Sequence, residues 1–160
     1  MNWIIVGAVL LADQIVKVSI AHSFTYGETI RITPFFNLVY YRNSGAAFGM
    51  LADAGGWQRY LLTAFALGVS FWLSWMLCQK QLWLPRLSYC LILGGALGNV
   101  ADRIIRGQVV DFLDFHYMQV HWPAFNLADT AIFLGVFCLI VDAIKQSHPA
   151  DPEKKTHKTQ

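Results

Sequence analysis

The sequence predicts an α-helical membrane protein with four transmembrane helices. Hydrophobic residues make up 56% of the 160-residue chain and charged residues only 14%, whereas soluble domains carry about 25% charged residues. Four segments are long and apolar enough to cross a bilayer core, which takes roughly 20 residues of helix. These segments extend over about residues 2–21, 57–78, 84–104 and 124–144. We assign them to a single integral-membrane domain over residues 1–146.

The first segment is expected to be a retained span rather than a cleavable signal peptide. It has no basic start and carries Asp13 and Lys17 within its apolar run, unlike a secretory signal. These two residues are four positions apart, so they share one helix face and can neutralise one another. From the residues alone, a structural role is the simpler interpretation of the pair.

Basic residues outside the spans orient the chain. The turn between the second and third spans, 79-QKQLWLPR-86, holds Lys80 and Arg86 and no acid. All lysines outside the spans lie on this side, and basic residues favour the cytoplasmic side of a membrane. Both termini are therefore expected in the cytoplasm. The tail 147–160 is polar and is predicted to be a disordered cytoplasmic segment.

Two long connections then face outward. Residues 29–43, TIRITPFFNLVYYRN, are rich in β-branched and aromatic side chains with partial alternation, which predicts one or two strands at the membrane surface. The next stretch, residues 44–56, is small and glycine-rich, which is typical of a flap. We expect residues 45–50 to close over a substrate.

In this orientation the polar residues of the spans collect near their outer ends. Ionisable groups inside spans are costly and usually mark function. The collected residues are Asp13, Lys17, Asn99, Asp102, Arg103, Asn126 and Asp129, with Asn43 and Asp111 on the outward connections. Ordinary alternatives exist, because Asn126 and Asp129 fit a helix cap and Gly94 and Gly98 fit close helix packing. By composition alone, Asp114 is an equal rival of Asp111.

The available side chains favour carboxylate chemistry without a metal or other cofactor. The sequence contains no H-E-x-x-H and no G-x-S-x-G, and Cys78, Cys90 and Cys138 form no C-x-x-C. A serine–lysine pair through Lys17 is weaker, since Asp13 is its nearer partner. The net charge of +2, without a basic stripe, argues against nucleic acid. Two close Asp side chains can share a proton, so that one activates water and the other polarises a carbonyl.

Five motifs, in order along the chain, resemble the bacterial lipoprotein signal peptidase family, signal peptidase II. They are 13-DQIVK-17, 43-NSGAAF-48, 94-GGALGNVADR-103, 109-VVDF-112 and 125-FNLAD-129. Each motif is weak alone, but together they extend along most of the chain without a departure. The resemblance implies an intramembrane aspartyl endopeptidase with four transmembrane helices, a small extracytoplasmic β-cradle and a short extracytoplasmic helix or loop.

The resemblance also implies a role for each motif residue. It makes Asp111 and Asp129 the catalytic pair and favours Asp111 over Asp114, while Asn126 would orient Asp129 or the attacking water. The other residues would line or support the substrate site: Asn43, Gly45, Asn99 and Arg103 along it, Asp13 and Lys17 from the first helix, and Asp102 as a brace for Arg103.

The implied substrate is a lipid-modified prolipoprotein, cleaved just before the diacylglyceryl-modified lipobox cysteine. The enzyme would lie among the lipids of the bacterial cytoplasmic (inner) membrane as a multi-pass monomer, with its active site facing the extracytoplasmic side. Two alternatives remain. One is a small four-span transporter coupled to protons or cations through Asp13 or Asp129, and the other is a non-catalytic membrane adaptor. Neither explains paired aspartates beside several asparagines at one depth.

Overall fold

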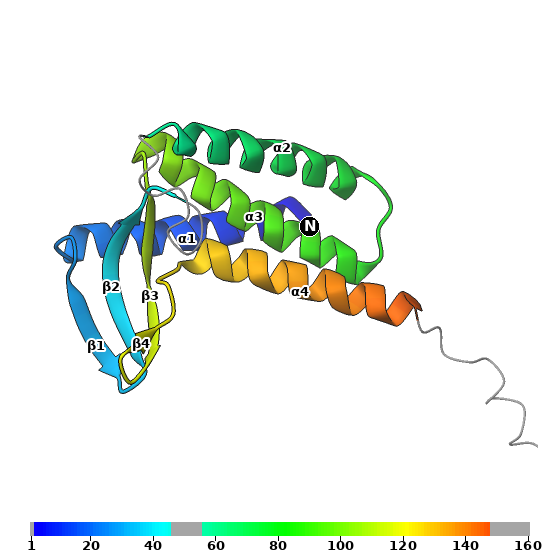
Figure 1. Cartoon of the computed structure of the whole chain (residues 1–160). Helices are drawn as coiled ribbons and strands as arrows, with labels where there is room; N and C mark the ends of the chain where they lie inside the picture. The colour runs from blue at the N-terminus through cyan, green and yellow to red at the C-terminus, as the bar shows by residue number, and fades with distance from the viewer. Residues whose placement is uncertain (1, 46–55, 148–160) are drawn as a thin grey trace, which may run out of the picture.

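The computed structural model describes residues 2–45 and 56–147. Residues 148–160 of the predicted disordered tail and residues 46–55 of the predicted flap lie outside these residues, and with them all of the expected clamp except Gly45. Ser147, which was expected to start the tail, is the last residue of a helix. The described part forms four long helices and one four-stranded antiparallel sheet (Figure 1). The sheet lies at one end of the helix bundle, and the turn between α2 and α3 lies at the other end.

The helices lie close to the predicted spans. They are α1 Asn2–Ser23, α2 Gln58–Cys78, α3 Trp83–Ile105 and α4 Leu127–Ser147. The largest difference is at α4, which was expected to begin near residue 124. It begins at Leu127 because the side chain of Asn126 caps the helix, and a capping residue lies just outside its helix.

Three of these helices, α1, α2 and α4, are long and apolar enough to cross a membrane. Large aromatic side chains cover their outward surfaces, as shown by Phe65, Phe71 and Phe133, which are 70%, 79% and 70% exposed. A helix that stays apolar on its outward face is typical of contact with lipid. The protein is therefore a helical membrane protein.

The helix α3 lies among the others and packs against α1, α2 and α4. It is less apolar than they are, because glycines and polar side chains fill the half that approaches the sheet. The cluster of Val6, Leu73, Leu77, Cys90 and Leu93 joins α1, α2 and α3 in the other half. Apolar packing thus holds one half of the bundle, and the polar groups collect in the other.

The sheet consists of β1 Thr29–Thr33, β2 Phe36–Asn43, β3 Val109–Tyr117 and β4 Val120–His121, in that order. The strands predicted within residues 29–43 are confirmed as the hairpin β1–β2. The second long connection supplies β3 and β4. No additional short helix occurs in residues 2–45 and 56–147.

The sheet is attached to α1 by a small apolar cluster. It consists of Ile20, Tyr40, Val110 and Phe112. Side chains alternate between the two faces of a strand, so Asp111, between Val110 and Phe112, points to the other face. Asp111 is still only 4% exposed. The cluster therefore anchors β3 in a position that brings Asp111 toward the helix ends.

Candidate active site

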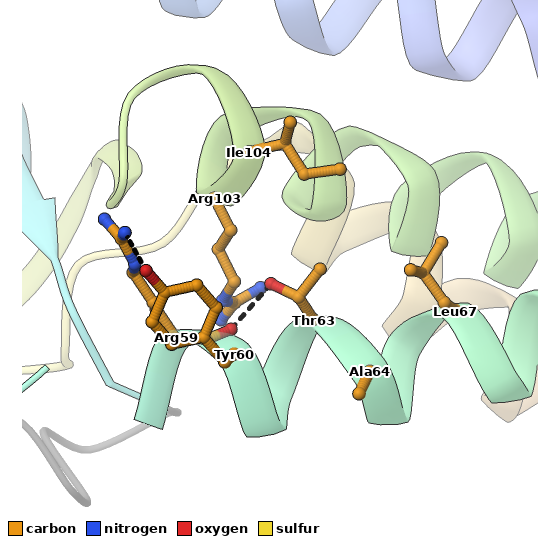
Figure 2. A pocket seen from close by; sticks show the side chains of 7 residues that line it. All are labelled: Arg59, Tyr60, Thr63, Ala64, Leu67, Arg103 and Ile104. Atoms are coloured by element: carbon orange, nitrogen blue, oxygen red, sulfur yellow. Dashed lines mark hydrogen bonds between the residues drawn. The ribbon is translucent and has the colours of Figure 1, made fainter. Parts of the chain in front are cut away.

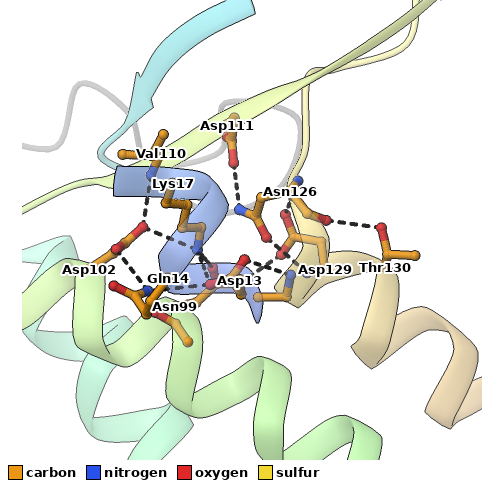
Figure 3. Close-up of polar contacts among 12 residues, drawn as sticks. Asp13, Gln14, Lys17, Asn99, Asp102, Val110, Asp111, Asn126, Asp129 and Thr130 are labelled. Atoms are coloured by element: carbon orange, nitrogen blue, oxygen red, sulfur yellow. Dashed lines mark hydrogen bonds and ion pairs between the residues drawn. The ribbon is translucent and has the colours of Figure 1, made fainter. Parts of the chain in front are cut away.

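Asn126 connects the two aspartates that the motifs single out (Figure 3). Its Nδ2 donates to Asp111 Oδ1 at 2.7 Å, and its backbone N–H donates to Asp129 Oδ2 at 3.3 Å. Asp111 lies on β3 and Asp129 in the first turn of α4. One residue thus holds carboxyl groups from the sheet and from the bundle side by side.

Asn126 is also the N-terminal cap of α4. Its Oδ1 accepts a hydrogen bond from the N–H of Asp129 at 2.9 Å, while Oδ2 of Asp129 accepts one from the N–H of Asn126. This reciprocal arrangement is a capping box, which satisfies backbone donors that a helix start leaves unpaired. The predicted cap is confirmed, and the same contacts fix the carboxyl group of Asp129.

Two further asparagines complete the shell around the carboxyl groups. Asn43, at the end of β2, donates its Nδ2 to Asp111 Oδ2 at 3.2 Å. Asn99, on α3, donates its Nδ2 to Asp129 Oδ1 at 2.8 Å. All four carboxyl oxygens of Asp111 and Asp129 therefore accept a hydrogen bond from an asparagine.

Burial raises the pKa of Asp111 to about 7, and the neighbouring carboxylate of Asp129 acts in the same direction. The hydrogen bonds from Asn126 and Asn43 oppose this change, because they stabilise the charged form. A carboxyl group with this pKa retains a proton in a large fraction of molecules at neutral pH. The pair can thus hold one shared proton, as two close carboxyl groups must.

Asp114, the rival by composition, has other partners. It accepts a hydrogen bond from Asn37 Nδ2 at 2.8 Å, and one of its carboxyl oxygens lies 2.9 Å from His121 Nδ1. It is three residues beyond Asp111 on β3, so the strand directs its side chain to the opposite face. The structure therefore groups Asp111, and not Asp114, with Asp129.

Lys17 lies at the centre of a buried polar network next to this site. Its Nζ lies 2.8 Å from Asp13 Oδ2 and 3.1 Å from Asp102 Oδ2, and it donates to Asn99 Oδ1 at 2.9 Å. Lys17, Asp13 and Asp102 are all 0% exposed. Asp13 also accepts the N–H of Ala128, in the first turn of α4, at 2.9 Å. The predicted pairing of Asp13 with Lys17 is confirmed.

Asp102 connects this network to the strand that carries Asp111. Its Oδ2 accepts the backbone N–H of Val110 at 3.0 Å. The resemblance places Asp102 beside Arg103, but among the described residues its second ion pair is with Arg106, one turn further along α3. Asp102 thus holds the start of β3, and its carboxylate also acts electrostatically on Arg103.

Gln14 and Arg106 were missed by the sequence analysis. Gln14 donates its Nε2 to Asp102 Oδ1 at 3.2 Å and to Gly98 O at 3.1 Å, and its Oε1 accepts from Arg106 Nη1 at 3.1 Å. One signal was available, because Arg106 follows Asp102 by four residues, a spacing at which charges pair on a helix.

Two glycines of α3 let the network and α4 approach closely. A Cβ added to Gly98 would lie 2.7 Å from Asp13 Oδ2, and one added to Gly95 would lie 2.3 Å from Ala128 O. Both separations are shorter than van der Waals contact, so only glycine fits. The packing role predicted for this glycine-rich stretch is confirmed, and it brings the start of α4 against α3.

Arg103 links the remaining motif residues at the edge of the site. Its Nη1 donates to Asn99 O at 3.4 Å and its Nη2 to Gly45 O at 3.2 Å. The N–H of Gly45 in turn donates to Asn43 Oδ1 at 2.9 Å. Arg103 is therefore connected to Asp129 through Asn99, and to Asp111 through Gly45 and then Asn43.

A hollow of about 350 Å³ opens next to Arg103, between α2 and α3 (Figure 2). None of the five sequence motifs lies on this face of α2. The residues that line the hollow are Arg59, Tyr60, Thr63, Ala64, Leu67, Arg103 and Ile104.

Comparison with known proteins places this geometry in a family. Residues 5–145 match the family model described as signal peptidase (SPase) II. The lipoprotein signal peptidase of Shewanella amazonensis is 48% identical over 151 residues, which cover 93% of this chain and 89% of the relative. The lipoprotein signal peptidase of Burkholderia thailandensis is 51% identical over 139 residues, which cover 86% of this chain and 84% of the relative.

Solved structures agree with the fold. A bacterial membrane enzyme determined by the in meso method at 2.3 Å resolution superposes with a TM-score of 0.83 and 27% identity, over 99% of this chain and 94% of the other. A second, at 1.9 Å resolution, gives a TM-score of 0.78 and 28% identity, over 90% and 92%. The transporter alternative is not supported by these similarities. The chain belongs to the signal peptidase II family, and it is a membrane protease that removes signal peptides from prolipoproteins.

Proposed function

We propose that Asp111 and Asp129 are the catalytic pair of this peptidase and that Asn126, Asn43 and Asn99 hold them in position. The main support is that each of the four carboxyl oxygens accepts a hydrogen bond from an asparagine. Amide donors orient carboxyl groups without adding a charge that would fix both as anions. A pair held in this way keeps one proton available for chemistry.

In the proposed reaction, Asp129 begins as the base and Asp111 as the acid. The carboxylate of Asp129 takes a proton from water, the water oxygen bonds to the scissile carbonyl carbon, and Asp111 gives its proton to the carbonyl oxygen. When the C–N bond breaks, Asp129 gives its proton to the leaving nitrogen and Asp111 recovers a proton from the hydroxyl group. The pair thereby returns to its first state without a cofactor.

The division of roles follows from the environment of Asp111. Its pKa is raised to about 7, so it retains the proton that the carbonyl oxygen requires. Asp129 accepts the capping N–H of Asn126 and the amide of Asn99, which hold its carboxyl group beside Asp111. Because Asp111 keeps the proton, Asp129 is left as the base.

We further propose that α3 is the fourth span and that both termini are cytoplasmic. The buried polar network joins the sheet-side ends of α1, α3 and α4, whereas Lys80 and Lys145 lie toward the opposite end of the bundle. Basic residues favour the cytoplasmic side, so the sheet, as the β-cradle, and the carboxyl pair would face the extracytoplasmic side of the bacterial inner membrane. In a cysteine-free variant, a cysteine at Thr29 should react with an impermeant thiol reagent in intact cells, and one at Gln81 should not.

The depth of the pair suits the proposed scissile bond, just before the diacylglyceryl-modified cysteine. The lipid on that cysteine keeps the bond at the membrane surface, where the sheet-side helix ends would hold the carboxyl groups. Asp111 and Asp129, with the asparagines around them, all come from one chain. We therefore propose a monomeric enzyme in contact with membrane lipid.

Cleavage of a purified diacylglyceryl-modified prolipoprotein in detergent tests the pair. Asp111→Asn and Asp129→Asn should each lower the cleavage rate by at least about 100-fold, the scale of general acid–base catalysis. Asp114→Asn is the matched control, because Asp114 lies on the same strand but bonds Asn37 and His121. If either pair variant cleaved as fast as the control, its aspartate would be structural.

A further inference from the structure

We propose that the hollow beside Arg103 receives the diacylglyceryl group of the substrate. The inference rests on the proposed function and adds where the lipid lies relative to the catalytic pair. It assigns a substrate-binding role to one face of α2, which carries no residue of the five sequence motifs.

The walls of the hollow combine apolar surface with polar groups. Besides Arg59, α2 contributes Tyr60, Thr63, Ala64 and Leu67 to the lining, and the spacing of these four places them on one helix face. Ile104 of α3 lines the opposite side. Thr63 uses its hydroxyl group within the helix, where it donates to Arg59 O at 2.6 Å, and Ala64 leaves open space. Figure 2 shows how these side chains are placed along α2. The face that they form can pack against acyl methylene groups.

Two arginines supply the polar groups. Arg59 stacks over the ring of Tyr60, with its guanidinium carbon 4.4 Å from the ring centre, and bonds the Tyr60 hydroxyl. Arg103 lines the same hollow, and its Nε is buried with no hydrogen-bond partner among the residues that the structure describes. A buried donor without an acceptor destabilises the folded protein. An ester oxygen of a diacylglyceryl group would supply that acceptor.

The position of the hollow matches the chemistry of the substrate. The lipid is attached to the side chain of the cysteine that follows the scissile bond, so only that residue separates the glyceryl group from the catalytic pair. Arg103 provides the same short connection in the protein. On one side, Arg103 donates to the backbone of Asn99, whose side chain donates to Asp129. On the other side, Arg103 donates to the backbone of Gly45. The N–H of Gly45 donates to Asn43, whose side chain donates to Asp111.

The size of the hollow determines which part of the lipid it holds. Pockets that bury small molecules have volumes of about 300–1,000 Å³, and this one, at about 350 Å³, is near the lower limit. It accommodates the glyceryl group and the first carbons of the acyl chains. Leu67 and Ile104 are 45% and 67% exposed, so the rest of each chain can continue into the surrounding lipid.

Filling the hollow tests the inference. Ala64→Trp should lower kcat/KM for the diacylglyceryl-modified prolipoprotein by roughly 10- to 100-fold, mainly through KM, because the new ring occupies space the lipid needs. Leu134→Trp is the matched control. Leu134 is an exposed apolar residue of α4, 47% exposed, at a similar distance from the start of its helix. An active wild type with an unimpaired Ala64→Trp variant overturns this inference alone, whereas an inert wild type overturns the proposed function and the inference together.

A second measurement needs no change in the hollow. A substrate with a photoreactive group on the first acyl carbons is bound to the Asp129→Asn variant and irradiated, and the labelled peptides are identified by mass spectrometry. Label on residues 60–67 of α2 or on Ile104 supports the inference. Label confined to α1 or α4 places the lipid elsewhere and overturns it.

Discussion

The ammonium group of Lys17 donates to Asn99 Oδ1 at 2.9 Å and thereby fixes which way the amide of Asn99 faces. With its oxygen held by Lys17, the amide must present its Nδ2 to Asp129, which it reaches at 2.8 Å. Lys17 also holds Asp102, which bonds the strand next to Asp111. A single buried cation therefore influences the position of both carboxyl groups.

We expect Lys17→Met to destabilise the protein and to impair cleavage. The variant leaves Asp13 and Asp102, both fully buried, without their shared cation, and breaking a buried ion pair costs on the order of 3–5 kcal/mol. Thermal unfolding in detergent should show a lower unfolding temperature for Lys17→Met than for the wild type. Lys145→Met, at the exposed end of α4, is the control and should unfold like the wild type. Equal stability of both variants would mean that the network does not need its cation.

Substitutions of Asn126 should separate its two roles. Asn126→Asp keeps a good N-cap residue, so the unfolding temperature should stay near that of the wild type. The added carboxyl group cannot donate to Asp111 as the amide does, so cleavage should fall by roughly 100-fold or more. Asn126→Ala removes both functions and should also lose about 1 kcal/mol of stability. Full activity in Asn126→Asp would exclude the bridging role.

The pH profile of cleavage should depend on Asn43. In the proposed reaction Asp111 must be protonated, so kcat/KM should fall as pH rises through its pKa of about 7. The hydrogen bond from Asn43 lowers that pKa. In Asn43→Ala, the basic limb of the profile, where kcat/KM falls as pH rises, should therefore move to higher pH. One hydrogen bond contributes about 1 kcal/mol, which corresponds to a shift of about 0.5–1 pH unit.

The matched control for Asn43 is Asn37→Ala. Asn37 lies on the same strand and donates to Asp114 instead of Asp111. Its removal should leave the basic limb in place. A limb that moved equally in both variants would point to a general change in the sheet.

Much of this arrangement could be predicted from the sequence. Apolar runs located the helices, because a span needs a long uninterrupted segment, and alternation located the hairpin β1–β2. The motif residues Asp111, Asp129, Asn43, Asn99 and Asn126 do meet in space. Spacing alone, however, did not distinguish Asp111 from Asp114. The resemblance favoured Asp111, and the register of β3 agrees with that choice.

Other features depend on how α3 is rotated about its axis. Because α3 packs against three helices, its apolar pattern does not define one buried face. The sequence therefore did not reveal that Asp102 turns toward Arg106 and Gln14. The hollow was hidden for a related reason. The α2 face around Ala64 resembles lipid-facing surface until the end of α3, with Arg103, is placed beside it.

Asp111→Asn should stabilise the folded protein, and more so at high pH. The folded-state pKa of Asp111, about 7, lies above its ordinary value of 3.8, so between these values the folded state binds more protons and stability falls as pH rises. Asparagine does not titrate, so it avoids this loss of stability, but its single side-chain oxygen can no longer accept both hydrogen bonds that the Asp111 carboxyl group accepts. The net gain in the free energy of unfolding should be on the order of 1–2 kcal/mol at pH 8. Thermal unfolding at pH 5 and pH 8 should show the larger gain at pH 8. An equal gain at both values would contradict a raised pKa.

Gly95→Ala should disrupt the packing of α4 against α3. Its new Cβ would lie 2.3 Å from Ala128 O, which is backbone of the first turn of α4, so the whole helix start must move. That turn carries Asp129, and cleavage should fall together with the unfolding temperature. Gly68→Ala on α2 is the control, because nothing lies within 4 Å of its added Cβ, and alanine favours a helix by about 1 kcal/mol. The control should be as stable as the wild type or more so, and a Gly95→Ala enzyme that behaved like it would show that α4 can shift without displacing Asp129.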